Sequence, residues 1–169
     1  MRDTILFGDC RDTLKQFDEQ ARTCITSPPY YGLRNYGDEE NQIGQEQTPE
    51  EFIEQLVNVF KEVRNVLTDD GTCWVNLGDS YYNYRPGKGQ GLAKQTVSNT
   101  KQDLPDVCPR RGNRLEGLKE KDLIGIPWMF AFAMRADGWY LRQDIIWHKP
   151  NPMPESVKDR CTKSHEYIF

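Results

Sequence analysis

Apolar residues occur along the first half of the chain in short runs and in one long helical repeat. Residues 2–7 and 21–25 are short apolar runs that predict strands, and the second ends at two prolines, which cannot donate to a sheet ladder. Residues 48–67 repeat apolar side chains at helical spacing, and residues 72–77 form a further apolar run. This order of strand, helix and strand predicts a parallel sheet.

The second half of the chain follows with a helix and two more strands. Residues 123–136 are apolar on nearly every side and predict a buried helix. Residues 139–147 predict a strand that stops at a Lys-Pro pair, and residues 167–169 look like the start of another. We therefore expect an α/β fold with helices on both faces of the sheet, incomplete toward the C-terminus.

The long helix has well-defined boundary signals. Thr48 can cap its N-terminus, Pro49 suits the first helical position, and Glu51 completes a capping box. Gly71 is expected to cap its C-terminal end. A short helix is also expected at residues 13–17, for which Asp9 is a candidate N-cap.

The composition is that of one ordinary globular domain, with 169 residues, 37% hydrophobic and 28% charged. The five cysteines lack any C-x-x-C pair, which argues against zinc and redox motifs and favours a reducing cytoplasm. No apolar run approaches the length of a membrane span. Residues 1–79 carry 7 Lys/Arg against 16 Asp/Glu, and residues 80–169 carry 15 against 10. The basic half could follow a phosphate backbone, although ordinary surface charge explains the same asymmetry.

Residues 80–118 differ from the rest of the chain because they are polar and rich in glycine and arginine. A loop of this length inside a compact domain is usually functional or disordered. Two interpretations stay open: a mobile insertion that orders on DNA, with its arginines on phosphates, or a disordered surface segment.

The most distinctive chemistry lies directly after the strand predicted at residues 21–25, in the loop Thr26-Ser27-Pro28-Pro29-Tyr30. The prolines fix the backbone and donate no hydrogen bond, so their carbonyls have no competing local donor. Ser27 adds a hydroxyl, and Tyr30 adds a flat ring with a polar tip. A loop at the carboxyl end of a strand is where α/β sheets bind ligands. The loop therefore suits a planar group that carries an NH₂, although a plain Pro-Pro turn beside a packed tyrosine is the alternative.

This loop resembles the [DNS]-P-P-[YFW] motif of DNA amino-methyltransferases that use S-adenosyl-L-methionine to methylate cytosine N4 or adenine N6. Other segments resemble that family in the same order along the chain: Gly8-Asp9-Cys10 and residues 71–79, 145–150 and 164–169. The resemblance implies a Rossmann-like methyltransferase sheet, with residues 1–169 as the catalytic part. It also implies a double-stranded DNA partner and a mechanism that needs no metal.

The resemblance further implies that a flipped target base stacks on Tyr30 and gives its amino hydrogens to Ser27 and to the Pro28 carbonyl. Ser27 in place of an aspartate favours cytosine N4 over adenine N6. By the same resemblance the catalytic loop consists of Ser27, Pro28, Pro29 and Tyr30. The candidate cofactor contacts are Asp9 and Thr26. The candidate DNA contacts are Arg34, Arg110, Arg111 and Lys149.

One feature of the family is missing from this sequence. The family holds the methionine part of the cofactor with a glycine-rich F-x-G-x-G turn, which comes last when the catalytic motif comes first, and the 169 residues contain no such turn. The chain thus looks like a catalytic half, to be completed by a missing C-terminal half or by a homodimer. The alternative is a catalytically inactive DNA- or partner-binding remnant. Methylation of RNA or of a protein amide is disfavoured, because those families place the glycine-rich turn before the loop.

Overall fold

The computed structural model describes residues 4–35, 41–82, 95–96 and 115–169, and it describes the side chains of all these except 34–35 and 95–96. The helices of these ranges are α1 (Cys10–Thr13), the 3-10 helix η1 (Leu14–Gln16), α2 (Pro49–Val66) and α4 (Ile126–Ala136). The strands are β1 (Ala21–Thr26), β2 (Arg34–Asn35), β3 (Leu67–Leu77), β4 (Gln95–Thr96), β5 (Ile145–His148) and β6 (His165–Ile168).

Four of the described strands form one sheet in the order β1-β3-β6-β5. β1 and β3 run parallel and are joined through α2, which confirms the expected strand-helix-strand unit and the α/β class. β6 pairs antiparallel with both β3 and β5, so the sheet is mixed. β2 and β4 form a separate short parallel pair.

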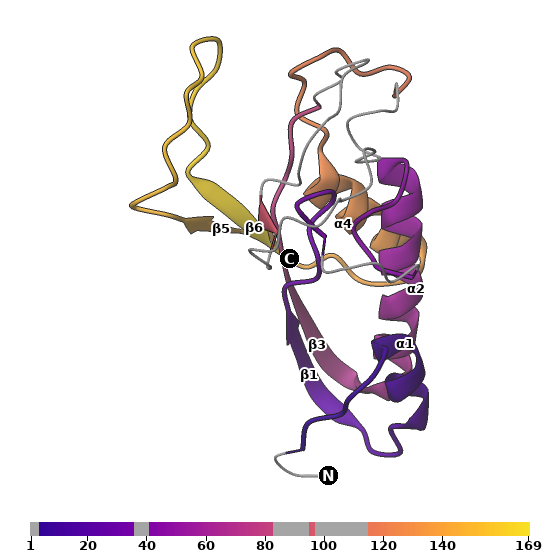
Figure 1. Ribbon diagram of the computed structural model, residues 1–169. Coiled ribbons are helices and arrows are strands. Elements are labelled where there is room, and N and C mark those ends of the chain that lie inside the picture. The colour runs from indigo at the N-terminus through magenta and orange to yellow at the C-terminus, as the bar shows by residue number, and fades with distance from the viewer. Residues whose placement is uncertain (1–3, 36–40, 83–94, 97–114) are drawn as a thin grey trace.

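The two long helices pack against each other on one side of the sheet (Figure 1). Phe60 of α2 meets Phe130 of α4 with ring centroids 5.2 Å apart, and both rings belong to the core that includes Val75 of β3. On the opposite face Ile25 and its register partner Trp74 are 78% and 42% exposed. The second helical layer expected from the sequence is therefore not found among the described residues.

The start of α2 is as expected, whereas its end is not. The capping box is formed: Glu51 N donates to the Thr48 hydroxyl, and the Glu51 carboxylate accepts from Thr48 N, each at 3.2 Å. The helix ends at Val66, because Leu67 is extended and buried and passes directly into β3. Gly71 is no helix cap. It lies inside β3 where the register with β1 shifts, and a Cβ there would lie 2.8 Å from the Thr68 carbonyl oxygen.

The strand expected at residues 2–7 is absent from its described part, residues 4–7. Ile5 and Phe7 are 77% and 89% exposed, and no described strand lies beside them to pair with their backbone groups. In place of the short helix expected at 13–17, the structure has α1 followed by η1. The helical segment begins already at Cys10, because Asp9 is its N-cap.

Two later elements are shorter than the sequence predicts. α4 begins at Ile126 because Gly125 adopts a φ of 88° and interrupts the helical pattern upstream. The Asp79 carboxylate, from the loop after β3, accepts from the N–H groups of Gly125 and Ile126 at 3.0 Å and so caps α4. The strand expected at 139–147 is β5, which begins at Ile145, where β6 first offers a pairing partner.

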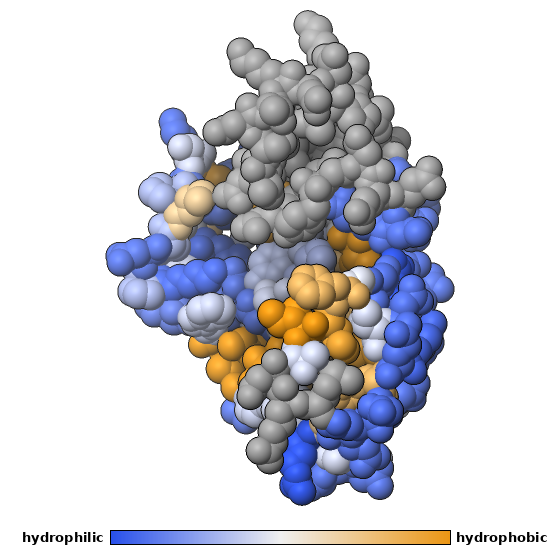
Figure 2. Space-filling view, turned by 60° about the horizontal axis from the view of Figure 1, so that its bottom comes forward, coloured by the Kyte–Doolittle hydropathy of each residue, from blue (hydrophilic) through white to orange (hydrophobic). Residues whose placement is uncertain are grey.

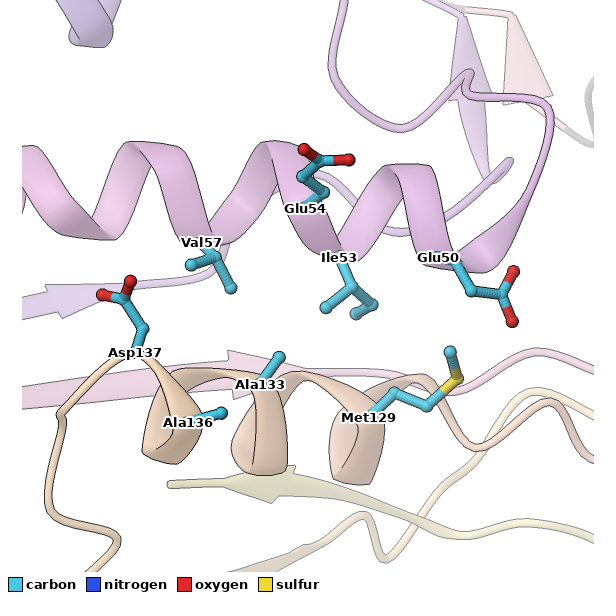
Figure 3. Close-up of a pocket in the computed structure, with 8 residues that line it drawn as sticks. All are labelled: Glu50, Ile53, Glu54, Val57, Met129, Ala133, Ala136 and Asp137. Atoms are coloured by element: carbon cyan, nitrogen blue, oxygen red, sulfur yellow. The ribbon is translucent and has the colours of Figure 1, made fainter.

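A groove of about 590 Å³ separates the exposed edges of α2 and α4. Figure 3 shows Ile53 and Val57 of α2 facing Met129 and Ala133 of α4 across it. A second cavity, of about 460 Å³, lies between β3, α4 and the segment 139–143. None of the candidate site residues whose side chains the structure describes lines either cavity. None of the described helices has the length and apolar character needed to cross a membrane.

Candidate active site

The proline loop, Thr26-Ser27-Pro28-Pro29-Tyr30, leaves the sheet at the carboxyl end of β1, as the sequence predicts. Thr26, the last residue of β1, pairs with Val75 of β3, and the chain then turns away through Ser27. Ser27 is exposed and Tyr30 is half-buried, so the serine hydroxyl meets solvent while the tyrosine ring lies against the protein.

The ring of Tyr30 rests on the backbone just beyond β3. A Cβ added at Gly78 would lie 2.6 Å from Tyr30 Cε2 and 3.0 Å from Cδ2. Any side chain at Gly78 would therefore push the ring away, and the glycine makes this close approach possible.

The hydroxyl of Tyr30 lies among side chains from two other strands. Its oxygen is 2.8 Å from Asn76 Oδ1 of β3 and 3.0 Å from Glu166 Oε2 of β6. Ser27 Oγ lies 3.3 Å from the same Asn76 oxygen and 3.5 Å from the Tyr30 oxygen. The Asn76 amide is itself oriented, because its Nδ2 donates to the Tyr167 carbonyl at 3.2 Å. Four polar side chains thus meet at one end of the sheet, and we call them the Tyr30 cluster: Ser27, Tyr30, Asn76 and Glu166.

The Tyr30 cluster contains more hydrogen-bond acceptors than donors. The Tyr30 and Ser27 hydroxyls supply one hydrogen each. The Asn76 amide supplies two, of which one goes to the Tyr167 carbonyl and the other acts on the Glu166 carboxylate. The acceptors are the Asn76 carbonyl oxygen, the Glu166 carboxylate and the hydroxyl oxygens themselves. An acceptor surplus of this kind suits a ligand that brings its own N–H donors.

The protonation states in the cluster follow from its surroundings. Burial raises the pKa of Tyr30 to about 12, with the nearby Glu166 charge adding to burial and the Ser27 hydrogen bond opposing it, so the phenol keeps its proton. Burial also acts to raise the pKa of Glu166. Hydrogen bonds from Lys149 and Tyr30 outweigh it, and the pKa lies below its usual range. At neutral pH Glu166 is therefore a carboxylate, paired with the Lys149 ammonium.

The two candidate cofactor contacts occupy different environments. Asp9 caps α1, accepting from Arg11 N at 2.8 Å, and pairs with the Arg11 guanidinium at 2.5 Å, which lowers the pKa of its carboxyl. Its interpretation as an N-cap is confirmed. Thr26 is half-buried at the end of β1, directly before Ser27. A cofactor contact of either residue stays a prediction.

Of the four candidate DNA contacts, the structure describes only the side chain of Lys149. Lys149 lies just after β5 and pairs with Glu166, beside the Tyr30 cluster. Arg34 belongs to β2, and its side chain is not described. Arg110 and Arg111, with most of the segment 80–118, lie outside the described residues. A DNA contact by any of them stays a prediction.

Sequence reasoning did not identify Asn76 and Glu166 as members of the site. Asn76 carried a usable signal, because it is the one polar residue in the run Cys73–Leu77. Glu166 stands in Ser164-His165-Glu166, a segment that drew attention by resemblance alone. Neither signal shows that the two residues meet Tyr30, since that depends on the order of the strands.

Comparisons with known proteins agree on one family. A sequence model described as DNA methylase, covering N6 and N4 enzymes, matches residues 21–169. The Type II methyltransferase M.Cfr9I of Citrobacter freundii is 50% identical over 167 residues, which are 98% of this chain and 53% of that protein. M.SmaI of Serratia marcescens is 48% identical over 166 residues, with shares of 98% and 54%. The chain thus spans about half the length of the curated relatives it matches.

Two solved structures share the fold. A chain of Thermus thermophilus, described as a putative DNA modification methylase and crystallised with S-adenosyl-L-methionine, superposes with a TM-score of 0.57 at 21% identity. The alignment covers 95% of this chain and 49% of that one. The cytosine-N4-specific PvuII DNA methyltransferase gives a TM-score of 0.58 at 16% identity, covering 95% and 45%.

Proposed function

The chain belongs to the N6/N4 DNA methylase family, and from this membership we propose that it is the catalytic part of a site-specific DNA methyltransferase. The proposed substrate is an exocyclic amino group of a base flipped out of double-stranded DNA, with cytosine N4 favoured over adenine N6. The observation that carries the proposal is the acceptor surplus of the Tyr30 cluster, placed beside a flat ring.

Three residues of the loop have separate tasks in this proposal. The ring of Tyr30, fixed against Gly78, stacks on the base, a contact worth about 1–3 kcal/mol. The Ser27 oxygen and the Pro28 carbonyl accept the two amino hydrogens. These bonds favour a nitrogen whose lone pair is less delocalised into the base ring. Holding the amino group in one place supplies much of the remaining acceleration.

The residues present fit part of a site for S-adenosyl-L-methionine. A carboxylate and a hydroxyl, Asp9 and Thr26, can bind polar groups of an adenosine, and the Asp9 side chain is 38% exposed. The cofactor, when bound, supplies a methyl group carried on a sulfonium. No F-x-G-x-G turn is present in the sequence to hold its methionine part. In this proposal Asp9 and Thr26 would contribute contacts to the cofactor from this part of the protein.

Serine at the head of the loop is the reason for favouring cytosine. It stands where adenine-specific members of the family more often carry aspartate, and it offers the amino group a neutral acceptor. The exposed Ser27 hydroxyl can turn toward a ligand or toward Asn76, which lies 3.3 Å away.

The test is methyl transfer from labelled S-adenosyl-L-methionine to double-stranded DNA, followed by chromatography of the digested nucleosides. The chain is assayed alone and together with the C-terminal half of the Citrobacter freundii relative. We expect N4-methylcytosine, and we expect Tyr30→Ala to lower the rate about 10- to 100-fold, as the loss of stacking predicts. Ser27→Ala should lower it as well, while Glu155→Gln, a change in an exposed ion pair, should not.

Three outcomes would change the proposal. N6-methyladenine in the digest would reverse the assignment of the base. Full activity of Tyr30→Ala would remove the catalytic role of the loop. DNA binding without cofactor binding or methyl transfer, alone and with the added half, would favour the alternative of an inactive DNA-binding remnant.

A further inference from the structure

A carboxylate lies at the tip of the Tyr30 side chain, and the function proposed above counts it among the acceptors without giving it a task of its own. Glu166 Oε2 is 3.0 Å from the Tyr30 oxygen, and the Glu166 side chain is only 18% exposed. Its other oxygen, Oε1, pairs with the Lys149 ammonium. A carboxylate withdrawn from water costs free energy unless it is paired and hydrogen-bonded. Its position here therefore calls for an explanation.

The number of hydrogens in the cluster indicates what Glu166 does. The Tyr30 phenol has a single hydrogen but faces two acceptors, Asn76 Oδ1 at 2.8 Å and Glu166 Oε2 at 3.0 Å. An ionised acceptor forms the stronger hydrogen bond. When the phenol donates to Glu166, the Asn76 oxygen becomes available to other donors. Ser27, 3.3 Å away, is one of these, and the exposed position of Ser27 leaves room for a ligand donor.

The same contact limits the motion of the ring. Around its Cδ2, Cε2 and Cζ atoms the ring lies against Gly78, where there is no space for a side chain. At its tip the ring is held by Glu166, which is 136 positions further along the chain and lies on β6, the strand that pairs with β3. A side chain fixed at two points loses less rotational freedom on binding a ligand, which raises affinity.

We propose that Glu166 is a positioning residue for Tyr30. It holds the ring in the orientation that stacks on a base, and Lys149 keeps the Glu166 carboxylate ionised and in place. The nature of the stacked ligand rests on the function proposed above, whereas the Glu166–Tyr30 contact does not. Lys149 acts here through Glu166, and this role requires no contact with DNA.

The contact is tested by a double-mutant cycle in the 169-residue chain that needs no activity. Tyr30→Phe, Glu166→Gln and the double variant are unfolded in urea and compared with the unaltered chain. We expect each single change to lower the midpoint and the double variant to fall no further than the larger single change, because both remove one interaction. Strictly additive shifts would overturn the proposal. Glu155→Gln, in the Glu155–Arg160 pair, is the matched control and should add independently to Tyr30→Phe.

The positioning role is tested by the fluorescence of 2-aminopurine in a single-stranded oligonucleotide, which stacking on Tyr30 should quench. Tyr30→Phe keeps the aromatic ring but removes the hydroxyl that contacts Glu166. We therefore expect it and Glu166→Gln each to weaken binding about tenfold, and the double variant to be no weaker. Unchanged binding by Glu166→Gln would overturn the proposal.

The two experiments separate this inference from the function on which it rests. One outcome is that the urea experiment shows coupling between Tyr30 and Glu166, while the unaltered chain does not quench 2-aminopurine. This outcome would support the contact between Glu166 and Tyr30 and count against base stacking. Quenching by the unaltered chain without coupling would support stacking and overturn the role of Glu166.

Discussion

Tyr30 is held at both ends of its side chain, and the contact at each end leads to a separate prediction. The ring lies against Gly78, and the hydroxyl lies against Asn76 and Glu166. The geometry of the candidate site therefore depends on residues that are not themselves in the proline loop.

The close contact at Gly78 predicts a specific effect of a single methyl group. In Gly78→Ala the new carbon would lie 2.6 Å from the Tyr30 ring, so the ring must move. We expect a loss of about 1–3 kcal/mol in the free energy of unfolding, as for other overpacked sites. Urea denaturation measures the loss. In a Tyr30→Ala background the same change should cost little, and a full cost there would contradict the assigned contact.

The ionised state of Glu166 predicts a pH dependence of stability. The pKa of Glu166 in the folded chain lies below its ordinary value of 4.5. Its contribution is therefore complete above about pH 4.5 and is lost as the pH falls through the lowered pKa. Unfolding midpoints measured from pH 7 down to pH 3 should fall less steeply for Glu166→Gln than for the unaltered chain. Equal slopes would show that Glu166 is not paired in solution.

At the scale of elements, α4 carries two phenylalanines whose environments differ. Phe130 is 2% exposed and packs edge-on against Phe60 of α2, whereas Phe132 is 50% exposed. The apolar character of nearly every side predicted a buried helix, but for the same reason the sequence does not distinguish the two positions.

This difference predicts unequal costs for the same substitution on one helix. Phe130→Ala should lower the free energy of unfolding by about 3–5 kcal/mol, since it opens a cavity between α4 and α2. Phe132→Ala should cost well under about 2 kcal/mol, since its ring contacts Trp128 and Arg135 near the surface. Urea denaturation of both variants provides the comparison, and similar losses would mean that the packing of α4 is wrongly assigned.

At the scale of the whole molecule, two large apolar side chains are exposed on one face of the sheet. Ile25 of β1 and Trp74 of β3 are register partners that stand on it. Figure 2 shows, on the side of the molecule that it presents, hydrophobic residues gathered between hydrophilic borders. Parallel strands are normally covered on both faces, so this surface favours association.

We expect Ile25→Lys to reduce self-association of the chain while leaving its unfolding midpoint within the range of ordinary surface changes, because the Ile25 side chain is 78% exposed. Sedimentation velocity across a range of concentrations measures the association. Met153→Lys is the matched control, since Met153 is equally exposed, at 76%, but lies in the segment between β5 and β6 that projects from the sheet (Figure 1). An equal effect of both variants would indicate a general effect of charge.

The sequence by itself determined the features that depend on residues close together in the chain. These include the capping box of α2, the strand that stops before the two prolines, and the composition of the proline loop, which also carried the family resemblance. Boundaries were predicted less well where they depend on distant partners. Residues 4–7 have no neighbouring strand among the described residues, β5 begins only where β6 pairs with it, and α4 begins where Asp79 caps it.

Only the tertiary structure decided which side chains surround Tyr30. Asn76 and Glu166 are 46 and 136 residues away from it in sequence, and they meet its hydroxyl because β6 pairs antiparallel beside β3. Strand order is set by the packing of the whole domain, and no local pattern encodes it. The sequence thus determined the chemical groups of the loop, while the fold decided which groups hold them in place.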